Sequence, residues 1–218
     1  MMNYGLFNPN IYPRCHGAMR INGVGILNVE PNMATVILGV ITENISLKVA
    51  QKENTLKSMS LIKQLYEMNI PKEKIKTVSY DIQPQYDFID GKQVFRGYRV
   101  ANMLSVTIKD LTTIGEVIDK STASGANSVS NITFSVDNPS LYYNKALNLA
   151  ITNAIVKATD ASNKLGVNLN KIPYKIIEES YSTINGDISL LKFNAVSTPI
   201  LPGEINITAK IQAIFSYQ

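Results

Sequence analysis

The last residues of the chain alternate between apolar and polar side chains, and this pattern constrains the fold more than any other. Apolar residues occupy every second position from Ile205 to Tyr217, with Thr208, Lys210 and Gln212 between them. Successive side chains of a strand point to opposite faces. The pattern therefore predicts a long antiparallel strand with one buried face and one wet face.

A second alternating region predicts a pair of strands joined at Asp90-Gly91. Because Gly tolerates positive φ, this dipeptide suits a type I′ turn. Pro84 lacks a backbone N–H and so indicates an edge strand or a bulge. One strand is expected to place on a single face Val78, Tyr80, Ile82, Pro84, Tyr86 and Phe88. The return strand is expected to run in the register of Val94, Arg96, Tyr98, Val100, Asn102, Leu104, Val106 and Ile108.

Helical spacing is found over residues 46–69, 110–125 and 138–166. The first helix is expected to bury a stripe consisting of Val49, Leu56, Met59, Ile62, Leu65 and Met68. The third has an alanine-rich stripe consisting of Leu147, Ile151, Ala154, Ala158, Ala161 and Leu165. We expect this stripe to pack on the chain's own sheet, and a helix–helix contact between subunits is the alternative.

The order of these elements predicts the fold class. Further strands are expected over residues 20–29, 33–43, 129–136, 174–181 and 190–196. Together the segments predict an α+β protein with largely antiparallel sheets and three main helices, in which two interleaved sub-domains share the long strands. Residues 1–19 are expected to form an irregular arm, and residues 20–218 one α+β domain.

Composition and charge exclude several classes of protein. The net charge of +4 comes from scattered lysines, of which Lys72, Lys74 and Lys76 are the densest group, so we expect no nucleic-acid partner. The longest apolar stretch, residues 34–41, is far shorter than the about 20 residues of a membrane helix, so no membrane span is expected. Residues 1–17 lack the pattern of a signal peptide. As written, the sequence predicts a cytoplasmic protein.

No set of residues predicts catalysis, a cofactor or a metal. Cys15 and His16 are adjacent and lie in the irregular arm, so they make a poor nucleophile and base. Glu178 and Glu179 are expected to point to opposite faces of a strand. Gly23-Val24-Gly25 starts like a dinucleotide fingerprint but lies inside a strand with no helix after it. A close approach of two backbones explains these glycines better. We therefore expect no enzyme.

Aromatic and arginine side chains gather around the predicted strand pair, as is typical of interface cores. The candidate interaction surface consists of Tyr80, Tyr86, Phe88, Arg96, Tyr98 and Arg99. Packing within the chain is one alternative for these side chains, and a platform for a peptide or a nucleic acid is another.

Short motifs follow one another in a fixed order from Arg20 to the C-terminus. They are Ile21-x-Gly23-x-Gly25, Pro31, Ile75-Lys76-Thr77, Ile82-x-Pro84-x-Tyr86, Gly97-Tyr98, Val106-x-Ile108-x-Asp110, Gly125-Ala126-Asn127, Phe134, Ala146, Ala150, Ala154, Lys157-Ala158, Ala161, Leu165-Gly166 and Pro202-Gly203. In this order the motifs resemble the SIMPL-domain family of bacteria. The resemblance implies a shared α+β fold over residues 20–218 and supplies no catalytic residues.

The family resemblance also implies a location and a behaviour. Its members are similar to periplasmic and envelope proteins, some immunogenic and some linked to oxidative-stress defence, and some assemble into large rings. A periplasmic or envelope location is therefore the alternative to a cytoplasmic one. We expect a non-enzymatic, self-assembling structural or interaction protein that forms a homo-oligomer. A partner-binding module that uses a sheet edge or the aromatic surface is one alternative, and an enzyme with a scattered site is another.

Overall fold

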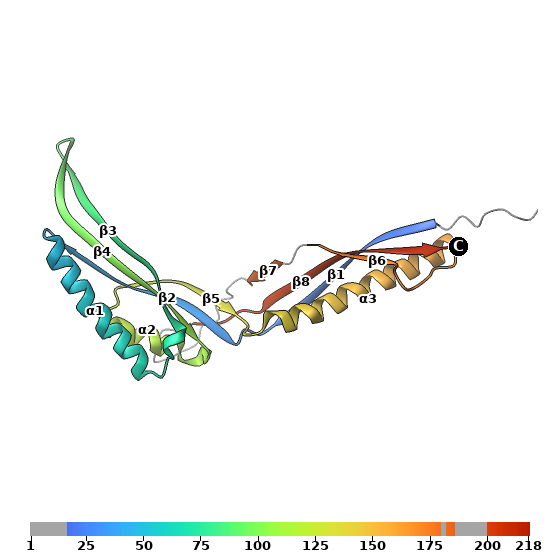
Figure 1. Ribbon diagram of the computed structural model, residues 1–218, viewed down its shortest axis with the longest axis horizontal. Coiled ribbons are helices and arrows are strands. Elements are labelled where there is room, and N and C mark those ends of the chain that lie inside the picture. The colour runs from blue at the N-terminus through green and yellow to red at the C-terminus, as the bar shows by residue number, and fades with distance from the viewer. Residues whose placement is uncertain (1–16, 180–181, 186–199) are drawn as a thin grey trace, which may run out of the picture. The chain divides into compact units, whose positions relative to one another are not determined.

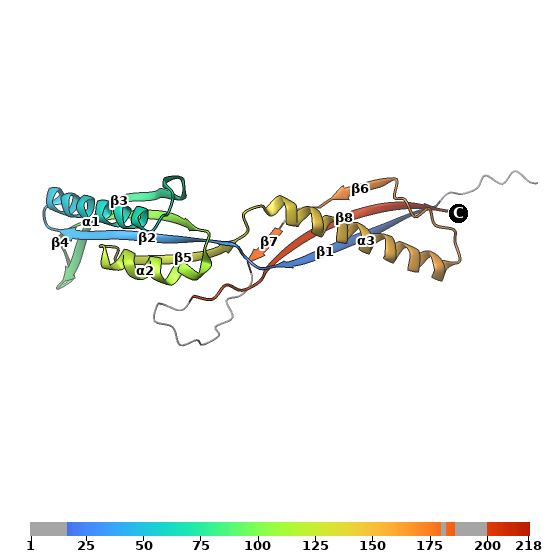
Figure 2. The ribbon, with the colours of Figure 1, turned by 90° about the horizontal axis from the view of Figure 1, so that it is seen from below.

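The computed structural model describes residues 17–179, 182–185 and 200–218 and divides the chain into two compact units. Unit 1 comprises Met1–Asn28, Asn138–Ile184 and Asn206–Gln218, and unit 2 comprises Val29–Asp137 and Asn185–Ile205. Each unit joins helix to an antiparallel sheet (Figure 1, Figure 2), which confirms the α+β class with two interleaved sub-domains. The long strands are not shared as expected, because each lies in one unit apart from an end residue. Residues 1–16 and the expected strand over 190–196 lie outside the described residues.

Unit 2 has a four-stranded sheet in the order β3-β4-β2-β5. The strands are β2 (Met33–Asn44), β3 (Ile75–Ile89), β4 (Lys92–Ile108) and β5 (Ser128–Ser135), and short 3-10 turns cover Lys72–Lys74 and Leu111–Thr113. The helices α1 (Leu47–Glu67) and α2 (Ile114–Ala123) belong to the same unit. The core consists mainly of Ala34, Val36, Leu38, Leu61, Leu65, Leu104, Val106, Ile114 and Val117.

Helix α1 turns a different face to the sheet from the one predicted by its apolar spacing. Its buried residues are Ala50, Asn54, Ser58, Leu61 and Leu65. Of the expected stripe, Leu65 is buried, whereas Val49, Leu56 and Met59 are 42%, 60% and 64% exposed. The expected buried stripe is therefore wrong over the first half of the helix.

Polar contacts explain which face of α1 is buried. The amide of Asn54 donates hydrogen bonds to the carbonyls of Val40 and Val100 at 2.8 and 3.1 Å. Ser58 donates to Asn54 Oδ1 at 3.3 Å, and Asn102 donates to Ser58 Oγ at 3.1 Å. We call Asn54, Ser58 and Asn102 the polar seam. Because buried polar groups need these partners, the seam turns the apolar stripe toward solvent.

Unit 1 has a sheet in the order β1-β8-β6, with β7 paired to β8. Its strands are β1 (Gly17–Val29), β6 (Lys175–Glu178), β7 (Ser182–Asn185) and β8 (Ile205–Tyr217). Strand β8 covers the span predicted from its alternation, and Ile207, Ala209, Ile211, Ala213 and Phe215 are buried. Helix α3 (Pro139–Leu165) begins after Asn138, whose side chain accepts from the Leu141 amide, and ends at Gly166 with φ 69°. Both ends were predicted.

A pair of glycines lets α3 lie close to β1. The buried residues of α3 are Ala146, Ala150, Ala154, Ala158 and Ser162. A Cβ atom at Gly25 would lie 2.0 Å from the Ala146 oxygen, and one at Gly23 would lie 2.2 Å from the Ala150 oxygen. The glycines therefore mark a close backbone approach, and α3 packs on the chain's own sheet, as expected. The buried stripe shares only Ala154 and Ala158 with the predicted one. Leu147, Ile151 and Ala161 are half-buried, and Leu165 is 65% exposed.

Candidate functional site

Strands β3 and β4 extend beyond the end of β2 as a two-stranded ribbon. The last residue of β2, Asn44, pairs with Tyr98, so residues 85–97 have no third strand beside them. We call residues 85–97 the ribbon. Its turn has φ angles of 49° at Asp90 and 75° at Gly91, which are the positive values that a type I′ turn requires. This confirms the predicted turn, and Pro84 lies on the edge strand β3, as expected.

A bulge at Arg96 curves the ribbon at its base. Gln85 pairs with Gly97 and Tyr86 pairs with Phe95, which leaves Arg96 without an opposite residue. Gly97 has φ 152°, and a Cβ atom there would lie 2.8 Å from the Asn44 oxygen. A bulge of this kind increases the bend and twist of a strand. In Figure 1 the ends of β3 and β4 curve accordingly.

One face of the ribbon is aromatic, and Tyr98 continues this face just beyond the ribbon's base. Residues that are directly opposite in an antiparallel pair share a face, so Tyr86 and Phe95 lie on the same side as Tyr98 and Phe88. The Phe95 ring makes edge-to-face contacts with Tyr86 at 5.7 Å and with Tyr98 at 5.2 Å between centroids. Phe88 is 76% exposed. The rings therefore support one another while much of their apolar surface stays in water.

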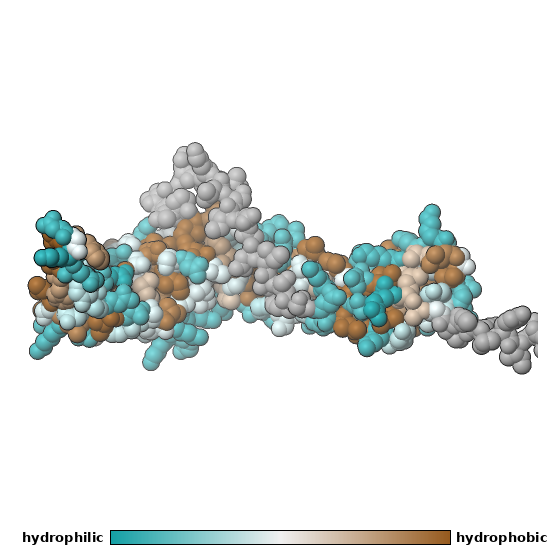
Figure 3. Space-filling model, turned by 90° about the horizontal axis from the view of Figure 1, so that it is seen from above, coloured by the Kyte–Doolittle hydropathy of each residue, from teal (hydrophilic) through white to brown (hydrophobic). Residues whose placement is uncertain are grey.

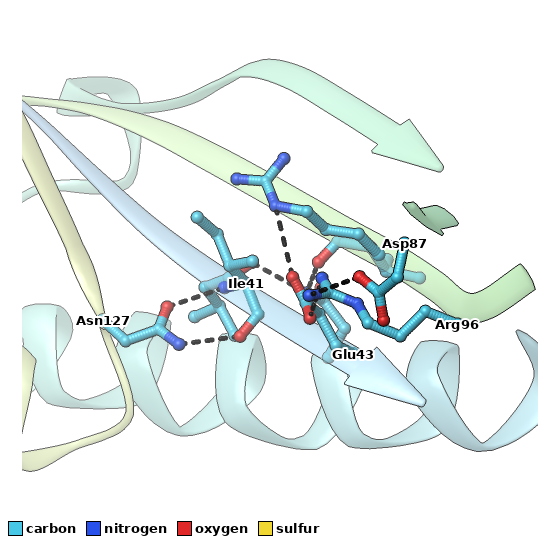
Figure 4. A network of polar contacts seen from close by, with 9 residues as sticks. Ile41, Glu43, Asp87, Arg96 and Asn127 are labelled. Carbon is cyan, nitrogen blue, oxygen red and sulfur yellow. Dashed lines mark hydrogen bonds and ion pairs between the residues drawn. The ribbon is translucent and has the colours of Figure 1, made fainter. Parts of the chain in front are cut away.

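The other face carries an ion-pair network, shown in Figure 4. Glu43 of β2 contacts Arg96 at 2.9 Å and Arg99 at 3.9 Å, and Arg96 also contacts Asp87 at 3.8 Å. The side chains of Glu43, Arg96 and Asp87 are about half exposed, so each pair contributes about 0.2–1 kcal/mol. The network ties the bulge to the end of β2 and fixes the direction in which the ribbon leaves the sheet.

Asn127 completes the edge of β2 near this network. Its side chain accepts from the Ile41 N–H and donates to the Ile41 carbonyl, both at 2.7 Å (Figure 4). Strand β5 pairs with β2 only as far as Gly39, so the Asn127 amide takes the place of a further strand residue. No local pattern around Asn127 indicates this role.

The structure divides the predicted surface between the two faces. Tyr86, Phe88 and Tyr98 lie on the aromatic face, and Arg96 and Arg99 belong to the ion-pair network. Figure 3, which shows unit 2 from the ribbon side, has hydrophobic and hydrophilic residues interleaved at the left end. The surface therefore combines exposed apolar area with fixed charges.

Tyr80 keeps the predicted alternation with Tyr86, pairs with Asn102 and is 49% exposed, but it lies outside the ribbon. Two irregularities in the register correct the rest of the predicted strand pair. Phe95, which the alternation missed, belongs to the aromatic face, whereas Val94 is opposite Asp87. The bulge at Arg96 shifts the phase by one residue, so the side chains before it change faces. Val78 is likewise unpaired at a second irregularity, between Thr77 and Ser79.

Two of the residues considered for chemistry, Cys15 and His16, lie outside the described residues. Within those residues no group of three His, Cys, Asp or Glu side chains comes close enough to hold a metal ion, and no helix is long and apolar enough to cross a membrane. Glu178 accepts a hydrogen bond from Tyr143.

A hollow of about 220 Å³ lies at the base of the ribbon, lined by Glu43, Asn44, Ile45, Gln85, Arg96, Gly97 and Tyr98.

Comparison with known proteins gives one family and two groups of relatives. The model of the SIMPL family, described as "Protein of unknown function (DUF541)", matches residues 19–215. The 26 kDa periplasmic immunogenic protein of Brucella abortus is 27% identical over 207 residues, which cover 89% of this chain and 82% of that protein. The uncharacterized protein YggE of Escherichia coli K12 is 28% identical over 142 residues, or 65% of this chain and 58% of that protein.

Proposed function

The chain belongs to the SIMPL family, and we propose that it is a non-enzymatic protein that binds further copies of itself through the ribbon. The single observation that carries this proposal is the aromatic face, where Phe88 is 76% and Tyr86 46% exposed. Aromatic side chains are enriched in the centres of protein interfaces. A ribbon that needed only to be soluble would gain nothing from presenting them to water.

The rigidity of the ribbon supports a binding role. An isolated two-stranded hairpin is only marginally stable in water, and here ring contacts brace one face while the ion pairs of Glu43 brace the other. Ordering these side chains before binding reduces the entropy that association costs. The strand that carries Phe88 is therefore braced on both faces before a partner binds.

Light scattering coupled to size-exclusion chromatography tests the proposal. We expect the unmodified chain to elute as an assembly at micromolar concentration, and Phe88→Ser to shift it toward a single chain. Ile172→Ser is the matched control, because Ile172 is also 76% exposed but lies outside the ribbon. A single-chain mass for the unmodified protein, or an unchanged assembly for Phe88→Ser, would refute the proposal.

The edge of β3 favours a second candidate function, a module that binds an extended partner strand. Strand β3 lies at the edge of its sheet, and an exposed edge can pair with a further strand. Pro84 limits such pairing, because it offers no N–H. A pulldown from the native lysate separates the two functions, since recovery of the chain alone favours self-assembly.

The compartment forms part of the proposal. Two of the relatives are named periplasmic immunogenic proteins, and the cytoplasmic expectation gains no support from the comparisons. We therefore propose a periplasmic or envelope location, where the stress role implied by the family resemblance remains a prediction. Fractionation of cells that express the native gene tests this, and recovery with cytoplasmic markers would contradict it.

A further inference from the structure

The outer face of α1 is an apolar stripe that faces away from the core of unit 2. Val49, Leu56, Met59 and Tyr66 follow one another at helical spacing and are 42%, 60%, 64% and 45% exposed. The opposite face of the helix is held by the polar seam. A helix usually buries its apolar side chains. Here Leu61 and Leu65 do lie in the core, but the stripe remains in water, so it is suited to a partner.

Lysines outnumber carboxylates on the stripe side of the helix, where Lys48, Lys52 and Lys63 lie with Glu53 and Glu67. Lys52 is four residues from Leu56, and Lys63 is four residues from Met59, so both are their neighbours on the helix surface. Lys63 pairs with Glu67 at 3.6 Å, whereas no ion pair is found for Lys52 among the described residues. A partner that fits this face carries apolar side chains together with negative charge.

The ribbon tip of the same protein has this chemistry. Phe88 and Ile89 are 76% and 55% exposed, and they lie between two carboxylates, Asp87 and Asp90. Asp87 contacts Arg96 at 3.8 Å, whereas no ion pair is found for Asp90 among the described residues. Apolar surface and charge are thus both complementary to the outer face of α1.

We propose that the ribbon tip of one copy binds the outer face of α1 of the next copy. Phe88 would cover Leu56 and Met59, and Asp90 would lie near Lys52. The flexible thioether of Met59 suits it to mould around an aromatic ring. This inference rests on the proposed function and names its acceptor.

The contact is heterologous, because the tip and α1 are different surfaces and every copy carries one of each. Such contacts build rings or open filaments rather than closed twofold dimers. A heterologous contact also has a property that a twofold contact lacks. A copy with a damaged tip and a copy with a damaged acceptor can still bind each other through the two surfaces that remain intact.

Mixing two variants uses this property. Phe88→Ser removes the tip anchor, and the double variant Leu56→Gln with Met59→Gln removes the acceptor. Gln has nearly the helix propensity of Leu and Met, and both positions are exposed, so thermal unfolding should show an intact fold. Leu165→Gln is the control, because Leu165 on α3 is 65% exposed. Loss of a central anchor raises a dissociation constant by about thirty-fold or more.

We expect each variant alone to give single chains in sedimentation velocity, the equimolar mixture to give a one-to-one dimer, and Leu165→Gln to assemble like the unmodified chain. A mixture that stays as single chains would overturn the pairing of tip and α1. If only the double variant assembles normally, the acceptor is not α1, while the proposed function stands. If Phe88→Ser also assembles normally, the proposed function fails as well.

Discussion

Replacing Asn54 with alanine tests why the first half of α1 turns its apolar side chains toward solvent. Asn54 is 1% exposed, and its amide donates to the carbonyls of Val40 and Val100 while its oxygen accepts from Ser58. Alanine removes these three hydrogen bonds and leaves space beneath the helix. If the polar seam holds α1 on the sheet, unit 2 must become markedly less stable.

The expected loss of stability is the balance between lost contacts and a gain in helix propensity. Each hydrogen bond contributes about 0.5–1.5 kcal/mol net, and removing buried atoms adds a cavity cost. Alanine regains about 0.6 kcal/mol of helix propensity relative to asparagine. The free energy of unfolding should therefore fall by about 2–3 kcal/mol, which is large compared with the usual effect of a surface substitution.

Urea unfolding followed by far-UV circular dichroism measures this loss. The protein should be dilute enough to be a single chain, because assembly adds its own free energy to the apparent stability. Thr55→Ala on the exposed side of α1 is the matched control and should be neutral or slightly stabilising. A loss below about 1 kcal/mol for Asn54→Ala, or an equal loss for Thr55→Ala, would refute the role of the seam.

Two further predictions concern the glycines and the ion pairs. Gly25→Ala should lower the stability of unit 1 by about 2–3 kcal/mol in urea unfolding, because the new Cβ atom would lie 2.0 Å from the Ala146 oxygen. Gly91→Ala is the comparison, because a Cβ atom there would have nothing within 4 Å. It should lower stability by only about 1–2 kcal/mol, the cost of a positive φ for alanine. Glu43→Gln should lower stability by about 1 kcal/mol or less yet speed limited proteolysis of the ribbon, and an unchanged cleavage rate would contradict the bracing role of Glu43.

Local signals predicted much of the fold. The alternation ending at Tyr217 fixed the span of β8, and Asp90-Gly91 fixed the turn of the ribbon, because each depends only on neighbouring residues. The ends of α3 followed for the same reason, since Asn138 and Gly166 act on the adjacent turn of helix. The expectation that Pro84 lies on an edge strand was likewise confirmed.

Long-range contacts decided what the sequence could not predict. Apolar spacing on α1 indicated a buried Leu56, but the partners of Asn54 lie on two strands far away in the sequence. The prediction omitted Phe95 from the aromatic face. Strict alternation assumes an unbroken register, and the bulge at Arg96 shifts the register by one residue. Only Gly97, directly after the bulge, hints at that irregularity in the sequence.

A single fluorophore at the ribbon tip tests the central claim most directly. The chain contains no tryptophan, so Phe88→Trp reports on that site alone. If a second copy covers the aromatic face, the emission should move to shorter wavelength as concentration rises, in step with the mass from light scattering. Emission that stays at the wavelength of a water-exposed indole while the mass increases would contradict the claim.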